Sequence, residues 1–189
     1  MTIPILVTFS GGASGNWRVD DIRPVSGASL SMCARVWVQD DADTGPIDQA
    51  VWTLRGTTSN TRYTQRSEVT ALNAVQQGLA RPQATQAALI PIRKSKEWWA
   101  LAQDERRAIF QEQSKHISIG MDYLPGVARR LHHCREMHEP FDFVTWFEYS
   151  PEDTAAFDEM LGRLRASIEW TYVEHEVDIR LTRIAHAAT

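Results

Sequence analysis

The sequence predicts an α+β fold, ferredoxin-like in its second half. Two observations carry this prediction. Short runs with alternating apolar residues are interspersed with stretches of helical spacing, and in the second half their order is β-α-β-β-α-β. That order is typical of the ferredoxin-like arrangement. The first half predicts a reduced unit of the same kind, so we expect two closely packed units, over residues 1–85 and 86–189.

Elements of the first half have the weaker patterns. Three apolar runs predict strands, at Ile3–Ser10, Arg35–Gln39 and Val51–Arg55. A stretch with helical spacing follows at Ser67–Leu79. The acidic segment Asp40–Asp48 contains a Gly-Pro step and predicts a surface loop.

The second half opens with a strand and a helix. Ala87–Arg93 is a short apolar run and predicts the strand. The spacing from Gln103 to Tyr123 predicts one amphipathic helix, and Pro125-Gly126 ends it. Asp104 and Glu105 lie in its first turn, where the helix dipole favours acidic side chains.

A hairpin, a helix and a final strand complete the second half. Val127–Cys134 and Phe141–Phe147 predict the hairpin, and Val173–Leu181 predicts the last strand. Ser150-Pro151-Glu152-Asp153 combines an N-cap residue, a proline and two acids, which indicates a helix start. One buried helix face is predicted from the apolar residues Phe157, Met160, Leu161, Leu164 and Ile168.

Composition and charge exclude several classes of protein. Hydrophobic residues make up 43% of the 189 and charged residues 23%, as in ordinary globular domains. The formal net charge of −4 argues against a nucleic-acid-binding protein, and no apolar stretch approaches the length of a membrane span. The N-terminus lacks the features of a signal peptide, and Cys33 and Cys134 form no CxxC pair. We therefore expect a cytoplasmic protein.

Six histidines invite a search for a metal site. His132, His133 and His138 lie near Cys134, but on a predicted strand that runs into a turn. Neither an HExxH nor a paired CxxC motif supports zinc. We interpret this group as strand and surface residues. His116, late in the predicted helix, could be either a hydrogen-bonded core histidine or a ligand.

Four charged or aromatic residues also have ordinary structural interpretations. Arg129 occupies an interior position of a predicted strand, and a buried arginine needs an anionic partner, either a carboxylate or a bound anion. Glu169 by itself is typical of a solvated carboxylate at a helix end. Lys94 and Trp98 could be a surface charge beside a core aromatic residue.

Taken together, these segments resemble the chlorite dismutase family, specifically its short, dimeric branch. The likeness covers most of the chain from about Val51 and, more thinly, the GGASGNW segment near the start. It is carried by RGTTSNTRY (55–63), AALIPIRKSKEWW (87–99), DERRAIF (104–110), HISIGMDYLPGVARRLHHCRE (116–136), EPFDFVTWFEYSPE (139–152) and IEWTYVEHEVDIRL (168–181).

The resemblance implies a ferredoxin-like C-terminal unit that binds haem b, packed with a reduced ferredoxin-like N-terminal unit. His116 matches the proximal ligand of the haem iron, and Glu169 matches the glutamate that accepts the other ring N–H of that histidine. Arg129 matches the distal arginine above the iron, and Gln76 looks like its distal neighbour.

Residues for a haem propionate are also implied by the resemblance. Lys94 and Trp98 look like the pair that fixes the propionate, and Asn60 and Tyr63 are weaker candidates for the same task. The CxxCH signature of covalently attached haem is absent from the sequence, so the haem is expected to bind without thioether links.

The activity implied is the decomposition of the chlorite anion to chloride and dioxygen by a homodimer, with neither nucleic acid nor membrane as a partner. Coproheme decarboxylases share the fold, but they lack the distal arginine and are usually longer. Arg129 and the short first half therefore favour the dismutase. Two alternatives remain at this point: a haem-binding or haem-sensing protein without meaningful chlorite turnover, and a binding module without haem.

Overall fold

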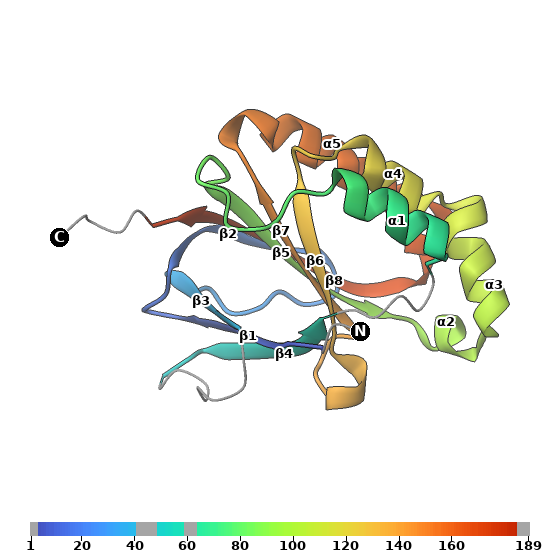
Figure 1. Ribbon diagram of the computed structural model, residues 1–189. Helices are drawn as coiled ribbons and strands as arrows, with labels where there is room; N and C mark the ends of the chain where they lie inside the picture. Colours follow the sequence, from blue (N-terminus) through green and yellow to red (C-terminus); the bar gives the residue numbers. More distant parts are fainter. Residues whose placement is uncertain (1–3, 41–48, 59–63, 185–189) are drawn as a thin grey trace.

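The computed structural model describes residues 4–40, 49–58 and 64–184. Within them, eight strands close into one barrel in the order β1-β3-β2-β8-β5-β7-β6-β4, and the helices gather over one side of it (Figure 1). The strands are β1 (Leu6–Gly12), β2 (Trp17–Ser26), β3 (Arg35–Asp40), β4 (Trp52–Thr58), β5 (Gln86–Lys94), β6 (Ala128–His133), β7 (Phe143–Tyr149) and β8 (Val173–Arg183).

The strand and helix order of the second half agrees with the sequence pattern. The α-helices of the chain are α1 (Arg66–Val75), α2 (Lys96–Ala100), α3 (Gln103–Arg107), α4 (His116–Asp122) and α5 (Thr154–Arg165). From β5 onward the chain runs strand, helices, strand, strand, helix, strand, and β8, β5, β7 and β6 are neighbours in the sheet. The predicted hairpin of β6 and β7 and the final strand β8 are confirmed.

The sequence predicted two packed units, but it did not predict that their strands close into one barrel. Both outer strands of the second half continue into the first half, because β8 pairs with β2 and β6 pairs with β4. Unpaired strand edges are unfavourable, and closure satisfies their backbone groups. The boundary predicted between residues 85 and 86 falls at the start of β5, and the division into two units there stays a prediction.

Alternation along the strands creates two separate apolar cores. In β5, Ala87 and Leu89 belong to the core inside the barrel, whereas Ala88 and Ile90 belong to the core between the sheet and the helices. The register continues this division across the sheet, since Leu89 lies opposite Trp146 and Ala88 lies opposite Phe147. Successive side chains on a strand point to opposite faces, so one strand serves both cores.

The helix predicted from Gln103 to Tyr123 is wrong as a single element. It is divided into α3, a π-helical turn η1 (Ala108–Gln113) and α4. Lys115, between the last two, has a positive φ of 53°, which no α-helix continues through. His116 is therefore the first residue of α4, not a residue late in a longer helix.

Three further differences concern the ends and number of elements. The strand β2 was not predicted, and it pairs with β8 through two register irregularities that break its alternation. The short helix α2 was also missed, and α1 ends at Val75, four residues before the predicted Leu79. Ile3 and residues 41–48 of the predicted loop lie outside the described residues.

Charged side chains are buried between β8 and α5. Glu176 and Asp178 are both inaccessible to solvent, and the guanidinium group of Arg165 contacts both carboxylates, at 2.6 and 3.1 Å. Arg180 also pairs with Asp178. This arrangement fastens α5 to the outer face of the sheet.

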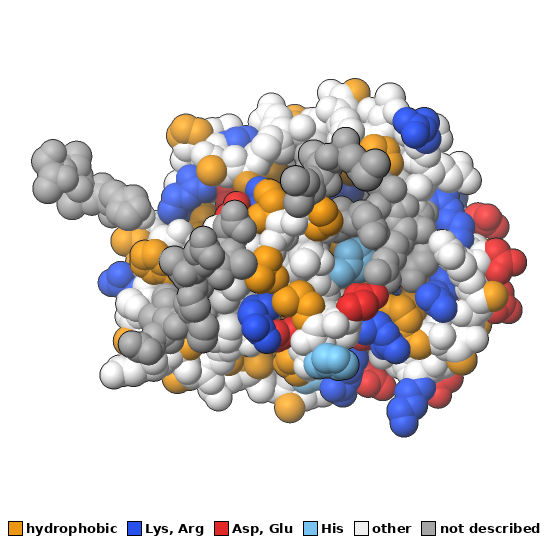
Figure 2. Space-filling view, turned by 60° about the horizontal axis from the view of Figure 1, so that its bottom comes forward, with side chains coloured by type: hydrophobic (Ala, Val, Ile, Leu, Met, Phe, Trp, Pro, Cys, Tyr) orange, Lys and Arg blue, Asp and Glu red, His pale blue; other side chains and the backbone are white. Residues whose placement is uncertain are grey.

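The surface over α2 and α3 has acidic and basic side chains mixed together (Figure 2). In the described part of the chain, no helix is long and apolar enough to cross a membrane.

We expect Asp178→Asn to lower the free energy of unfolding by about 2–3 kcal/mol, because it removes a buried charged partner from the partly buried Arg165 and Arg180. Burial raises the pKa of Asp178, but hydrogen bonds and charge from Arg180 and Arg165 outweigh it, so the net pKa is lowered. A lowered folded pKa contributes stability above the unfolded pKa, and this is lost as pH falls through the folded pKa.

Equilibrium unfolding from pH 8 to pH 3 measures this difference. The gap between the parent and Asp178→Asn should be constant at neutral pH and shrink below about pH 4. Asp158→Asn is the matched control, because Asp158 also pairs with Arg180 but its side chain is 54% exposed. This control should cost under about 1 kcal/mol. A gap that widened in acid would contradict the assignment.

Candidate active site between the sheet and the helices

A cavity of about 420 Å³ lies between the outer face of the sheet and the helices. Its walls are largely apolar, with Ile90 and Ile92 from β5, Phe143 and Phe147 from β7, and Leu161 from α5. The six site residues suggested by the sequence and the family resemblance all line it: Gln76, Lys94, Trp98, His116, Arg129 and Glu169. Asn60 and Tyr63 lie outside the described residues.

Glu169 joins two of these residues. One carboxylate oxygen lies 2.7 Å from Nδ1 of His116, and the other lies 2.7 Å from Nζ of Lys94. Its backbone N–H donates to the hydroxyl of Ser114 at 2.8 Å. Glu169 is 3% exposed, so the interpretation of this residue as a solvated carboxylate is wrong. The local sequence did not reveal the burial because its partners lie far away in the chain.

The charge on Glu169 persists at all ordinary pH values. Burial by itself would raise the pKa of this carboxyl group, but the charges and hydrogen bonds of His116 and Lys94 outweigh it and lower the pKa to about 2. The ionised carboxylate accepts a hydrogen bond, so Nδ1 of His116 is assigned the proton. The lone pair on Nε2 of His116 is then the group available to a ligand or metal.

The contact with a propionate that the resemblance implies for Lys94 stays a prediction, and in the structure Lys94 pairs with another residue of the site. Its side chain is 2% exposed, and its ammonium group pairs with Glu169. The same ammonium lies 4.6 Å from the ring centroid of Trp98 and 5.5 Å from that of Trp170. Because the carboxylate of Glu169 already neutralises this charge, the geometry favours a role beside His116 over contact with a propionate. Trp98 is buried and contributes its indole to the wall.

Arg129 extends from β6 across the cavity toward α4. Its guanidinium group donates to the backbone carbonyl of Gly120 at 2.8 Å. Burial lowers the pKa of Arg129 to about 10, so the group stays charged at neutral pH. In the described part of the chain, no carboxylate forms an ion pair with it. Of the two partners considered from the sequence, a carboxylate is therefore not found among these residues.

Two neighbours determine where Arg129 can lie. Gln76 follows the last residue of α1, and its side-chain amide donates to the backbone carbonyl of Arg129 at 3.1 Å. A Cβ atom on Gly120 would lie 2.7 Å from both terminal nitrogens of the guanidinium group. Gly120 therefore leaves the space that Arg129 occupies against α4.

The histidines that follow Arg129 form no metal site. Nδ1 of His132 lies 3.0 Å from the carbonyl of Val144, and burial lowers the pKa of His132 to about 4. Burial raises the pKa of Cys134 to about 12, so its thiol stays protonated. Within residues 4–40, 49–58 and 64–184, no group of three or more His, Cys, Asp or Glu side chains could hold a metal ion.

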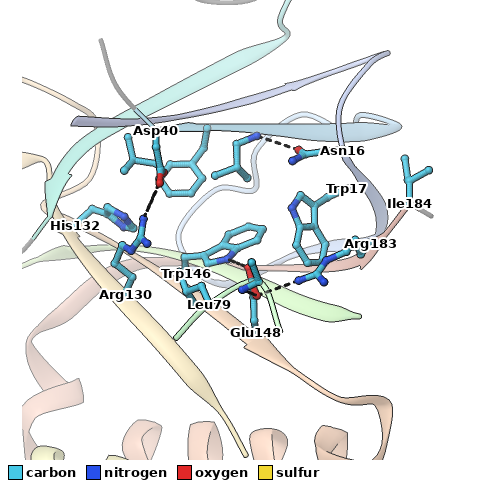
Figure 3. A pocket seen from close by; sticks show the side chains of 14 residues that line it. Asn16, Trp17, Asp40, Leu79, Arg130, His132, Trp146, Glu148, Arg183 and Ile184 are labelled. Carbon is cyan, nitrogen blue, oxygen red and sulfur yellow. Dashed lines mark hydrogen bonds and ion pairs between the residues drawn. The ribbon is translucent and has the colours of Figure 1, made fainter. Parts of the chain in front are cut away.

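A second cavity, of about 360 Å³, lies inside the barrel (Figure 3). Trp17 and Trp146 contribute aromatic walls to it. Each of its two arginines has a carboxylate partner: Arg130 contacts Asp40 at 3.2 Å, and Arg183 contacts Glu148 at 3.1 Å. The adjacent arginines of β6 thus have different partners: Arg130, which lines both cavities, pairs with Asp40, whereas Arg129 donates to Gly120 of α4.

Comparison with known proteins identifies the family. A family model for chlorite dismutase matches residues 41–185, which is most of the chain. The chain belongs to the chlorite dismutase family. A curated chlorite dismutase from Ideonella dechloratans is 31% identical over 75 residues, which are 40% of this chain. The matched segment spans about a quarter of that relative (24%).

Solved structures of the family are similar over nearly the whole chain. A dimeric chlorite dismutase from Nitrobacter winogradskyi matches with a TM-score of 0.87 and 51% identity, over 94% of this chain and 99% of that chain. A chlorite dismutase from Candidatus Nitrospira defluvii, in complex with imidazole, matches with a TM-score of 0.69 and 21% identity, over 95% and 91%. The second match shows a shared fold alone.

We expect Gly120→Ala to displace the guanidinium group of Arg129 without unfolding the protein. The new methyl group meets the end of a flexible side chain, and alanine favours a helix over glycine by about 1 kcal/mol. Gly162→Ala in α5 is the matched control, because nothing lies within 4 Å of its added Cβ. Crystal structures and equilibrium unfolding of both variants test this. An unmoved Arg129 in Gly120→Ala, at a large loss of stability, would contradict it.

Proposed function

We propose that this chain is a haem b enzyme that decomposes chlorite to chloride and dioxygen. One observation carries the proposal. A single cavity contains an imidazole paired with a buried, ionised carboxylate and an arginine that forms no ion pair within the described residues. Membership of the chlorite dismutase family supports it. The similarity to the dimeric structure from Nitrobacter winogradskyi further supports a homodimer.

The residues of the cavity fit haem b. A porphyrin needs apolar walls, and side chains of β5, β7 and α5 provide them. His116 would hold the haem iron through Nε2. Trp98 would lie beside a propionate, and Lys94 would stay with Glu169. Haem, when bound, supplies the iron chemistry that breaks the first chlorine–oxygen bond of chlorite.

Glu169 and Lys94 act on His116. The carboxylate fixes the ring tautomer with the proton on Nδ1, and it increases the donor strength of Nε2. Lys94 balances the charge of Glu169, so the buried carboxylate stays ionised. Together they orient His116 so that Nε2 faces the cavity.

Arg129 acts on the substrate. Chlorite and the hypochlorite fragment derived from it are both anions, and the guanidinium group offers them charge and several N–H donors. Retention of hypochlorite in the cavity keeps its oxygen close to the oxygen already removed, so that the two can combine as dioxygen. The conversion of chlorite to chloride and dioxygen needs no net proton, and no acid or base is assigned to it. Gln76 positions the backbone from which Arg129 extends.

We expect Arg129→Ala to retain haem but to complete roughly 10–100-fold fewer turnovers before inactivation. A charge-assisted hydrogen bond contributes about 1.5–3 kcal/mol, and hypochlorite that escapes oxidises the protein. An oxygen electrode, with chloride and a hypochlorite trap measured in parallel, follows the reaction. Arg18→Ala is the control, because Arg18 lines neither cavity and pairs with Asp20 at the surface. Equal turnover totals for Arg129→Ala and the parent would count against the role.

We expect His116→Ala to lose most of its haem and to release no oxygen from chlorite. The measurement is the Soret absorbance per chain after reconstitution, followed by oxygen release. His138→Asn serves as the control, because His138 is exposed and has a positive φ that asparagine tolerates. A normal Soret band in His116→Ala would exclude the ligand assignment. A parent protein that binds haem but releases no oxygen would favour a haem-binding or haem-sensing function instead.

A further inference from the structure

The hydrogen bond to Glu169 does not by itself fix the orientation of the His116 imidazole ring. It restrains the distance from Nδ1 to the carboxylate, but combined rotation about the two side-chain torsions can keep that distance and still tilt the ring. The side chain of His116 is 30% exposed, so close packing does not surround it on every side. Another contact must therefore define the plane of the imidazole.

Two aromatic rings lie nearly parallel to that plane. The ring of Phe110 has its centroid 4.4 Å from that of His116, with 27° between the planes. The ring of Trp170 lies 6.3 Å away, with 19° between the planes. Aromatic rings at these separations favour a restricted set of mutual orientations. They come from different parts of the chain.

Trp170 is itself held by a buried charge. Its indole N–H donates to one carboxylate oxygen of Glu176 at 2.7 Å. Glu176 is inaccessible to solvent, and its other oxygen accepts hydrogen bonds from Arg165 of α5 at 2.6 and 2.9 Å. Trp170 also follows Glu169 directly in the chain and lies 5.5 Å from the ammonium group of Lys94. The indole therefore has a fixed position beside both ends of the His116–Glu169–Lys94 series.

Phe110 owes its position to the π-helical turn η1. The same turn supports the start of α4, because the side-chain carbonyl of Gln111 accepts from the backbone N–H of Ile117 at 2.8 Å. The side-chain amide of Gln111 donates to Ser118 at 2.9 Å. After η1, the left-handed conformation of Lys115 turns the chain back. The turn thus positions both Phe110 and the first residue of α4.

We propose that Phe110 and Trp170 are positioning residues that fix the plane of the His116 imidazole. The inference rests on the proposed function for its consequence, since the orientation of the His116 ring would affect how it holds the haem iron. The orientation of the His116 ring is itself a property of the protein without haem. Glu169 then determines which atom of the ring faces the cavity, and the two aromatic rings determine the plane in which it does so.

The experiment compares Phe110→Leu, Trp170→Phe and Trp99→Phe. Trp170→Phe retains a ring but loses the hydrogen bond to Glu176. Trp99→Phe is the matched control, because its indole N–H donates to the carboxylate of Asp142 at 3.1 Å and it has no ring contact with His116. The first readout is the NMR signal of the His116 ring in protein without haem. The second is the electron paramagnetic resonance spectrum of the ferric, haem-loaded protein, with the rate of haem loss.

We expect broadened or doubled ring signals for Phe110→Leu and Trp170→Phe, and a single sharp signal for the parent and Trp99→Phe. In loaded protein, the two variants should show a wider spread of rhombic signals and lose haem about two- to tenfold faster. Unchanged spectra in both variants, with stability lowered as in Trp99→Phe, would overturn the proposal. If the parent takes up no haem, the proposed function fails, and the NMR comparison still decides the inference.

Discussion

The buried, ionised carboxylate of Glu169 is the interaction on which the candidate site depends. An isolated carboxylate inside a protein is costly, and it persists only where opposite charge and hydrogen bonds compensate. Here the compensation comes from two side chains on separate elements: Lys94 at the end of β5 and His116 at the start of α4. The hydroxyl of Ser114, between η1 and α4, instead accepts from the backbone N–H of Glu169 and helps to hold the residue in place. Removing Lys94 or His116 would leave part of the charge uncompensated, so β5 and α4 are linked through one group.

The barrel provides the second constraint. Strands in a closed sheet alternate between two environments, and in β6 this alternation separates two adjacent arginines. Arg130 pairs with Asp40, whose side chain is 55% exposed, whereas Arg129 enters the cavity beneath the helices. A shift of one residue in the register of β6 would exchange them. Pairing of β6 with β4 and β7 on its two sides fixes that register, so barrel closure bears directly on which cation faces the candidate site.

The sequence predicted the parts of this molecule whose pattern is local. A short apolar run identified β5, alternation identified β6 and β8, and the apolar spacing from Phe157 identified α5. The predicted buried face of that helix included Ile168, which lies beyond the end of α5 and is 51% exposed. It missed the break at Lys115, because a π-helical turn followed by one left-handed residue preserves nearly helical spacing on both sides. Barrel closure was also missed, because it depends on pairing between distant strands. The burial of Glu169 was missed for the same reason, since the two residues that pair with its carboxylate lie 53 and 75 positions away in the sequence. Family resemblance, not residue pattern, brought this residue to attention.

Local charge, not net charge, favours an anionic substrate in the candidate site. The chain as a whole carries a formal charge of −4, and in the cavity the charges of Lys94 and Glu169 offset one another. Arg129 remains as a cation that finds only a backbone carbonyl, on Gly120, as its partner among the described residues. A carbonyl accepts a hydrogen bond without neutralising the charge, so an entering anion gains the full electrostatic attraction of the guanidinium group. A protein that only stored haem would have no need for such a cation, and its presence therefore favours an enzyme that acts on an anion.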